Sequence, residues 1–195
     1  MRTRIACLLL LTTAALPASG EEGPFLHQRV DQLITTAQGD LAHLASPRCS
    51  DEEFLRRIFL DLAGRIPGHE EAQQFLDDEN PDKRANLAEQ LLASPRHARH
   101  LQHHLDVMLM QRLPKKHVDP VQWQEYLYSS MLENKPWNQL AEEILTADGA
   151  DEKQRSRARF LLARDLNFDD TTRDIGRIFL GRDMQCAQCH DHPSI

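Results

Sequence analysis

Cysteine and long apolar runs are both scarce in this sequence, and each shortage excludes a class of protein. Only four cysteines occur in 195 residues, and Cys7 lies in the N-terminal apolar stretch. The other three, Cys49, Cys186 and Cys189, are an odd number, which argues against a disulfide-stapled scaffold. Outside the N-terminal stretch no run is apolar enough to cross a bilayer, so we expect no further membrane span.

The first twenty residues are typical of a secretory signal peptide. Arg2 and Arg4 precede an apolar run over 5–16, and small residues follow before Glu21. That run would rise only about 18 Å as a helix, which is too short to span a membrane. We therefore expect an exported protein, periplasmic or extracellular, whose mature part is residues 21–195. A retained N-terminal anchor is the alternative.

The remaining charge balance is acidic. Without Arg2 and Arg4 the 23 basic residues become 21 against 30 acidic ones, and the formal charge moves from −7 to −9. A surface of this sign does not favour nucleic acid or anionic lipid. We expect neither as a partner.

The hydrophobic pattern is helical throughout, and no alternating strand of useful length occurs. Ser50 and Glu53 form a capping box, and Gly64 marks the end of that helix. Three later helices are expected to start at a capping residue followed by proline, namely Asn80-Pro81, Ser94-Pro95 and Asp119-Pro120. Further helices are expected over Trp137–Leu145, Ser156–Leu166 and Thr171–Gln185. The prediction is a single all-α domain of about eight short helices.

The most informative motif is Cys186-Ala-Gln-Cys189-His190, near the C-terminus. Two thiols at this spacing can each add to one haem vinyl group, and the adjacent imidazole can ligate the iron. The motif therefore favours covalent haem c. Two alternatives remain open: a zinc site, for which Cys186, Cys189, His190 and His192 can hardly all converge on one ion, and a redox disulfide.

A second haem ligand has to come from elsewhere, because only five residues follow His190. His97, His100 and His104 fall on one face of the expected helix after Pro95. They could hold a metal or supply a distal ligand. The alternative is a solvated histidine-rich surface opposite an apolar stripe of Leu101, Leu105 and Met108. His192 is a further, weaker candidate for the metal.

Four segments in order resemble the planctomycete-specific cytochrome-type (PSCyt) domain family, an exported bacterial domain of unknown function. They are Phe59-Leu-Asp-Leu-Ala-Gly-Arg-Ile-Pro67, Pro81-Asp-Lys-Arg84 running into Leu91-Leu-Ala-Ser-Pro95, Glu133-Asn-Lys-Pro-Trp137, and Phe179-Leu-Gly181 followed by Cys186-Ala-Gln-Cys-His-Asp-His-Pro193. The resemblance covers about Val30 to Pro193. It implies that Cys186 and Cys189 hold the haem, that His190 ligates iron, and that further cytochrome domains accompany the chain.

The sequence departs from that family at two places. Ser194 stands where an aromatic residue is usual, and the chain stops at Ile195, so it looks like a C-terminally truncated member. His104 stands where the family tends to have tryptophan.

We expect an exported electron-transfer domain with an unknown redox partner. One side of its haem would be open to solvent unless Ile175, Ile178 and Phe179 and the preceding helices cover it, and an open side favours a five-coordinate or water-ligated iron, or no stable haem. No hydrolytic constellation or phosphate-binding loop occurs. The rival hypotheses are a gas-binding haem bundle and a non-haem scaffold or interaction module whose cysteines bind zinc or form a disulfide.

Overall fold

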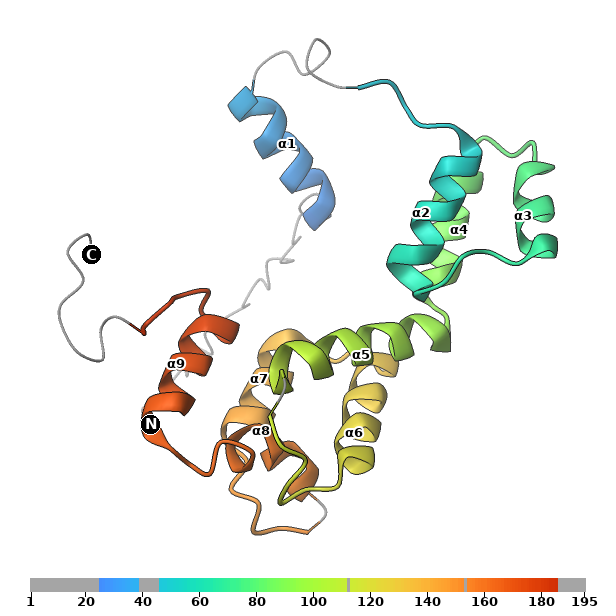
Figure 1. Ribbon diagram of the computed structural model, residues 1–195. Coiled ribbons are helices and arrows are strands. Elements are labelled where there is room, and N and C mark those ends of the chain that lie inside the picture. Colours follow the sequence, from blue (N-terminus) through green and yellow to red (C-terminus); the bar gives the residue numbers. More distant parts are fainter. Residues whose placement is uncertain (1–24, 39–45, 112, 153, 186–195) are drawn as a thin grey trace, which may run out of the picture. The chain divides into compact units, whose positions relative to one another are not determined.

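The computed structural model describes residues 25–38, 46–111, 113–152 and 154–185, and every regular element in these ranges is a helix (Figure 1). The elements are α1 Leu26–Gln38, α2 Asp51–Ala63, α3 His69–Leu76, α4 Lys83–Leu92, α5 Pro95–Met110, α6 Pro120–Leu132, α7 Trp137–Leu145, the 3₁₀ helix η2 Arg155–Ala158, α8 Arg159–Leu162 and α9 Phe168–Phe179. The all-α prediction is confirmed. None of these helices is both long and apolar enough to cross a membrane. The expected signal peptide lies outside the described residues.

The chain divides into two compact units, Met1–Arg48 and Cys49–Ile195. The described helix of the first unit, α1, is amphipathic. Its apolar residues Leu26, Val30, Leu33 and Ile34 recur at helical spacing, and all four are exposed. The other helices belong to the second unit.

The helices α2, α3 and α4 of the second unit enclose a small apolar core. Its buried members are Leu55, Phe59, Ala63, Phe75 and Leu91. The expected caps of α2 are present, since Ser50 accepts from the Glu53 amide at 3.4 Å and Gly64 is left-handed with φ 67°. The Glu53 carboxylate does not complete the capping box, because it pairs with Arg57 at 2.5 Å.

Two helix starts were predicted well and one was wrong. Ser94 accepts from the His97 amide at 3.1 Å, and Asp119 accepts from the Val121 amide at 2.9 Å. Asn80 does not begin α4. Its side chain accepts from the Asp82 amide at 2.9 Å, which forms a tight turn that delays the helix to Lys83.

A short helix, α3, was missing from the sequence prediction. Its start is Gly68, whose amide donates to the Glu71 carboxylate at 2.7 Å. The helix has eight residues and one buried side chain, Phe75, so its apolar periodicity is too brief to detect.

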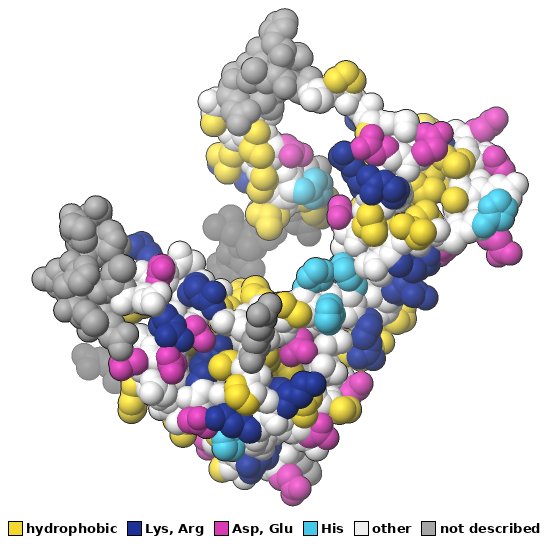
Figure 2. All heavy atoms as spheres, viewed as in Figure 1, with side chains coloured by type: hydrophobic (Ala, Val, Ile, Leu, Met, Phe, Trp, Pro, Cys, Tyr) yellow, Lys and Arg dark blue, Asp and Glu magenta, His cyan; other side chains and the backbone are white. Residues whose placement is uncertain are grey.

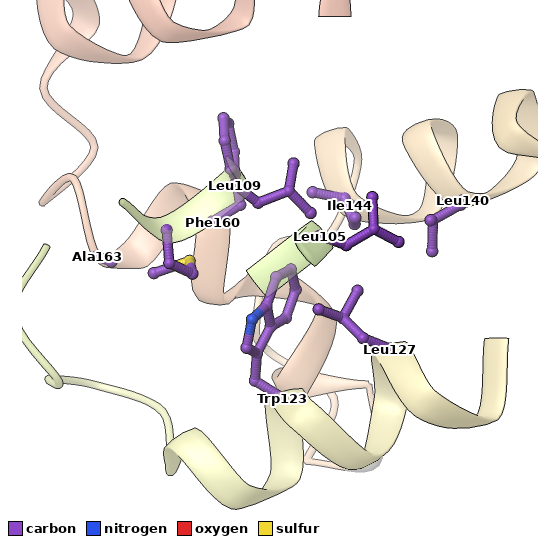
Figure 3. Packing of buried hydrophobic residues seen from close by; sticks show 9 residues of the cluster. Leu105, Leu109, Trp123, Leu127, Leu140, Ile144, Phe160 and Ala163 are labelled. Carbon is purple, nitrogen blue, oxygen red and sulfur yellow. The ribbon is translucent and has the colours of Figure 1, made fainter. Parts of the chain in front are cut away.

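The second core of this unit is larger and is built by α5, α6, α7 and α8 (Figure 3). Its labelled side chains point toward one another in the figure: Leu105, Leu109, Trp123, Leu127, Leu140, Ile144, Phe160 and Ala163. The Trp123 indole N–H donates to Asp106 at 2.9 Å, so the buried ring leaves no polar atom unpaired.

The helix α5 contacts both cores. It packs on α2 and α4 on one side and on α6 on the other. Its buried face is Ala98, Gln102, Leu105 and Leu109, whereas Leu101 and Met108 are 37% and 40% exposed. The expected stripe of Leu101, Leu105 and Met108 was therefore wrong in two of its three members, because contact with two cores rotates the buried face.

Candidate functional site

The residues of the haem motif lie outside the part of the chain that the structure describes. Cys186, Cys189, His190 and His192 are all in the range 186–195. Their roles therefore stay predictions. The structure does describe the helix that leads to them, α9, and the segment 180–185 that follows it.

A buried ion pair holds α9 in place. The Arg164 Nε donates to the Asp174 carboxylate of α9 at 2.8 Å, and both residues are only 4% exposed. The rest of the Arg164 guanidinium donates to the backbone carbonyls of Phe160 at 2.7 Å and Leu109 at 3.0 Å. One side chain thus joins α9 to the end of α5 and to α8.

The electrostatics of this pair follow from its burial. Burial lowers the pKa of the Arg164 guanidinium, and the hydrogen bond to Asp174 opposes that shift. The guanidinium also lies over the Phe160 ring, 3.8 Å from its centroid. Our sequence reasoning missed this pair. One feature of the sequence could have indicated it. Asp174 lies four residues before Ile178, so the two side chains lie on the same face of α9, which packs against the core.

The segment after α9 folds back onto the helix. Gly181 is left-handed, with φ 63°, and the Arg182 amide donates to the Gly176 carbonyl at 2.8 Å. The Met184 sulfur lies where a side chain on Gly176 would be, since a Cβ there would meet it at 2.6 Å. A glycine at 176 therefore allows residue 184 to pack against α9, two residues before Cys186. The helix ends at Phe179, whereas we expected it to continue to Gln185.

The three side chains that could cover the haem are apolar residues of the last two turns of α9. Ile175, Ile178 and Phe179 are partly buried against the second core. The exposed apolar side chains at this end of α9 are Leu180, at 67%, and Met184, at 38%. Trp137 of α7 stacks on Phe179 with 5.7 Å between ring centroids, and it remains 46% exposed.

The histidines of α5 divide into two kinds of contact. His97 is half-buried, and its Nδ1 lies 2.9 Å from the Leu62 carbonyl in the last turn of α2. His100 and His104 approach each other, with 3.1 Å between their Nε2 atoms. The three do not form one cluster, and in the described ranges no three His, Cys, Asp or Glu residues are placed to hold a metal.

His100 is the most constrained of these residues. It is half-buried, and its Nδ1 faces Gly64 at the end of α2. Burial lowers the pKa of its imidazole, the neighbouring His104, His97 and His103 lower it further, and a hydrogen bond with the Asp61 backbone opposes them. The expectation of a fully solvated histidine surface therefore fails for His97 and His100, which cover the end of α2. His104 is exposed.

These features define an all-α domain whose last described helix is followed, after the segment 180–185, by a Cys-x-x-Cys-His sequence. The chain belongs to the PSCyt2 family, described as a protein of unknown function (DUF1549), which matches residues 29–194. The resemblance found in the sequence is thereby confirmed, and the family's name marks the domain as cytochrome-like. No curated protein and no solved structure matches the chain.

Proposed function

We propose that the chain is an exported c-type haem domain that transfers electrons. Cys186 and Cys189 would form the two thioether bonds, and His190 would be an axial ligand of the iron. The observation that carries this proposal is the Cys-x-x-Cys-His sequence, because this donor set and spacing suit covalent haem attachment. The cytochrome-like family supports it.

The described residues next to the motif are compatible with a bound porphyrin. A haem needs apolar walls, since burying apolar surface contributes about 25 cal/mol per Å². Leu180 and Met184 follow α9 and are exposed apolar side chains, and Met184 is two residues before Cys186 in the sequence. Trp137 of α7 is a third exposed apolar side chain, stacked on Phe179. They would shield one edge of the ring from water.

The bound haem would supply a reversible one-electron couple, and the protein would set its environment. Two thioether bonds, from Cys186 and Cys189, would keep the porphyrin attached after export. His190 would ligate the iron, and the polarity of the surrounding residues would tune its reduction potential. The Arg164–Asp174 pair and the Gly176–Met184 contact hold the chain that precedes the motif against the second core.

The test is the mass and visible spectrum of the mature protein, made in a host that exports it and attaches haem. We expect a mass increase of one haem that survives denaturation. It should vanish in the variant Cys186→Ala with Cys189→Ala. Cys49→Ala is the matched control, because Cys49 is a half-buried free cysteine, and it should keep the haem.

The same experiment separates the rival hypotheses. A haem with a low-spin spectrum supports electron transfer with two strong axial ligands, and a high-spin spectrum favours gas binding at an open position. A colourless, folded protein with unmodified cysteines would overturn the haem proposal. Stoichiometric zinc in that protein would then favour a scaffold or interaction module.

A further inference from the structure

We propose that His100 and His104 of α5 form a second site, which binds a divalent transition-metal ion that prefers imidazole, such as Zn²⁺ or Cu²⁺. The two residues are one helical turn apart, and their Nε2 atoms face each other at 3.1 Å. This site does not involve the haem motif, so it does not depend on the proposed haem.

The separation of the two nitrogen atoms suits one shared ion. Zinc binds imidazole nitrogen at about 2.0–2.1 Å. Two such bonds place the nitrogens about 3.3 Å apart at a tetrahedral angle and about 2.9 Å apart at a right angle. The observed 3.1 Å lies between these values, so both imidazoles could bind with little movement.

The surroundings of His100 also favour an available lone pair. Its Nε2 faces His104 and its Nδ1 faces Gly64 at the end of α2, where the Asp61 backbone acts to raise the pKa of the ring. We infer that Nδ1 carries the proton of the neutral ring and is directed at the Asp61 carbonyl. A donor at Nδ1 leaves Nε2 unprotonated in the neutral ring. Backbone carbonyls hold metal-binding histidines in this way in many sites.

Metal binding requires the proton on the His104 Nε2 to move to the other ring nitrogen. With the inferred tautomer of His100, the His104 Nε2–H donates to the His100 Nε2 in the free protein, across their 3.1 Å separation. When the ion binds, that proton moves to the Nδ1 of His104 by exchange with water. Both imidazoles stay neutral and both Nε2 lone pairs face the ion.

The site is held on one side and open on the other. Gly64 has no side chain, and a Cβ there would lie 2.9 Å from the His100 Cε1 and still closer to its Nδ1, so the ring packs directly on the end of α2. His104 is exposed, and Figure 2 shows histidine side chains gathered on the surface at α5. The described residues provide no third side-chain ligand, so water completes the coordination.

The test uses the full mature chain with Cys186→Ser and Cys189→Ser, which removes the thiols that would compete for metal. Zn²⁺ is titrated into this parent by calorimetry. His104→Gln should weaken binding by at least about tenfold, as losing a partner in a metal site commonly does. The matched control is His103→Gln, since His103 is the adjacent exposed histidine, and it should change affinity less than about twofold.

A second measurement identifies the ligands. Nitrogen hyperfine structure from bound Cu²⁺ should report two imidazoles in the parent and in His103→Gln, and one in His104→Gln. The proposal is overturned if His104→Gln binds Zn²⁺ as tightly as the parent, or if both variants weaken binding equally. A failed haem test would leave this result unchanged, because the titrated protein cannot attach haem through cysteine.

Discussion

Replacing Asp174 tests whether one buried ion pair holds α9 in place. In Asp174→Asn the carboxylate charge disappears while the side chain keeps its size. The Arg164 guanidinium then stays buried without a counter-charge, although two of its hydrogen bonds, to the carbonyls of Phe160 and Leu109, remain. Losing one partner of a buried pair costs about 3–5 kcal/mol. We expect the lower end of that range, because asparagine can still accept a hydrogen bond.

Urea unfolding followed by circular dichroism measures this cost. A small domain has a free energy of unfolding of about 5–15 kcal/mol, so the loss would be a large fraction of the total. With a urea slope of about 1–3 kcal/mol per M, the midpoint should fall by about 1–3 M. The matched control is Asp170→Asn on the same helix, where Asp170 pairs with Arg173 at 2.8 Å on an exposed surface.

The control variant should lose at most about 1 kcal/mol, because surface ion pairs contribute little. A double variant, Arg164→Met with Asp174→Asn, should cost less than the sum of its single changes, since neither charge is then left alone. If Asp174→Asn costs no more than Asp170→Asn, the pair does not hold α9, and our account of how the chain before the motif is positioned is wrong.

Two further predictions concern the first core of the second unit. Gly64→Ala should lower the free energy of unfolding by more than the cost of a left-handed non-glycine residue, about 1–2 kcal/mol, because the new Cβ also meets His100. The control is Gly68→Ala, since Gly68 has an ordinary φ of −74°. Equal urea midpoints for the two variants would refute this prediction. A hydrogen bond from Arg65, with a smaller contribution from the Gly68 amide, holds the pKa of Glu71 below its ordinary value of 4.5. The stabilisation is therefore complete above about pH 4.5 and is lost as the pH falls through the lowered pKa. Glu71→Gln should cost about 0.5–1 kcal/mol at pH 6 and less at pH 3 in urea titrations, and a cost independent of pH would contradict the assignment.

Local interactions explain why much of the helical structure was predictable. A capping side chain and the amide it accepts from are two or three residues apart, so Ser94 with Pro95 and Asp119 with Pro120 indicate helix starts without knowledge of the fold. The same logic misplaced α4, because Asn80 can cap a helix or close a turn, and both use the same side-chain oxygen.

The candidate sites could be predicted only where their ligating residues are close together in the sequence. The thiols and imidazole of the haem motif lie within five residues, so spacing alone indicates their use. The histidines of α5 share a helix face, but that face does not reveal which pair meets. His97 turned to the Leu62 carbonyl and His100 to His104 because the end of α2 lies against α5.

The sequence by itself determined the helical class, the starts of α2, α5, α6 and α7, and the haem-type motif, because these depend on residues a few positions apart. Only the tertiary structure decided which side of α5 is buried, which ring nitrogen of His100 faces His104, and how Arg164 reaches Asp174 and the Leu109 carbonyl. Each of these depends on packing between helices or on groups as far as 55 residues apart. Helical periodicity relates a residue to its neighbours one turn away and carries no information about which helix will cover it.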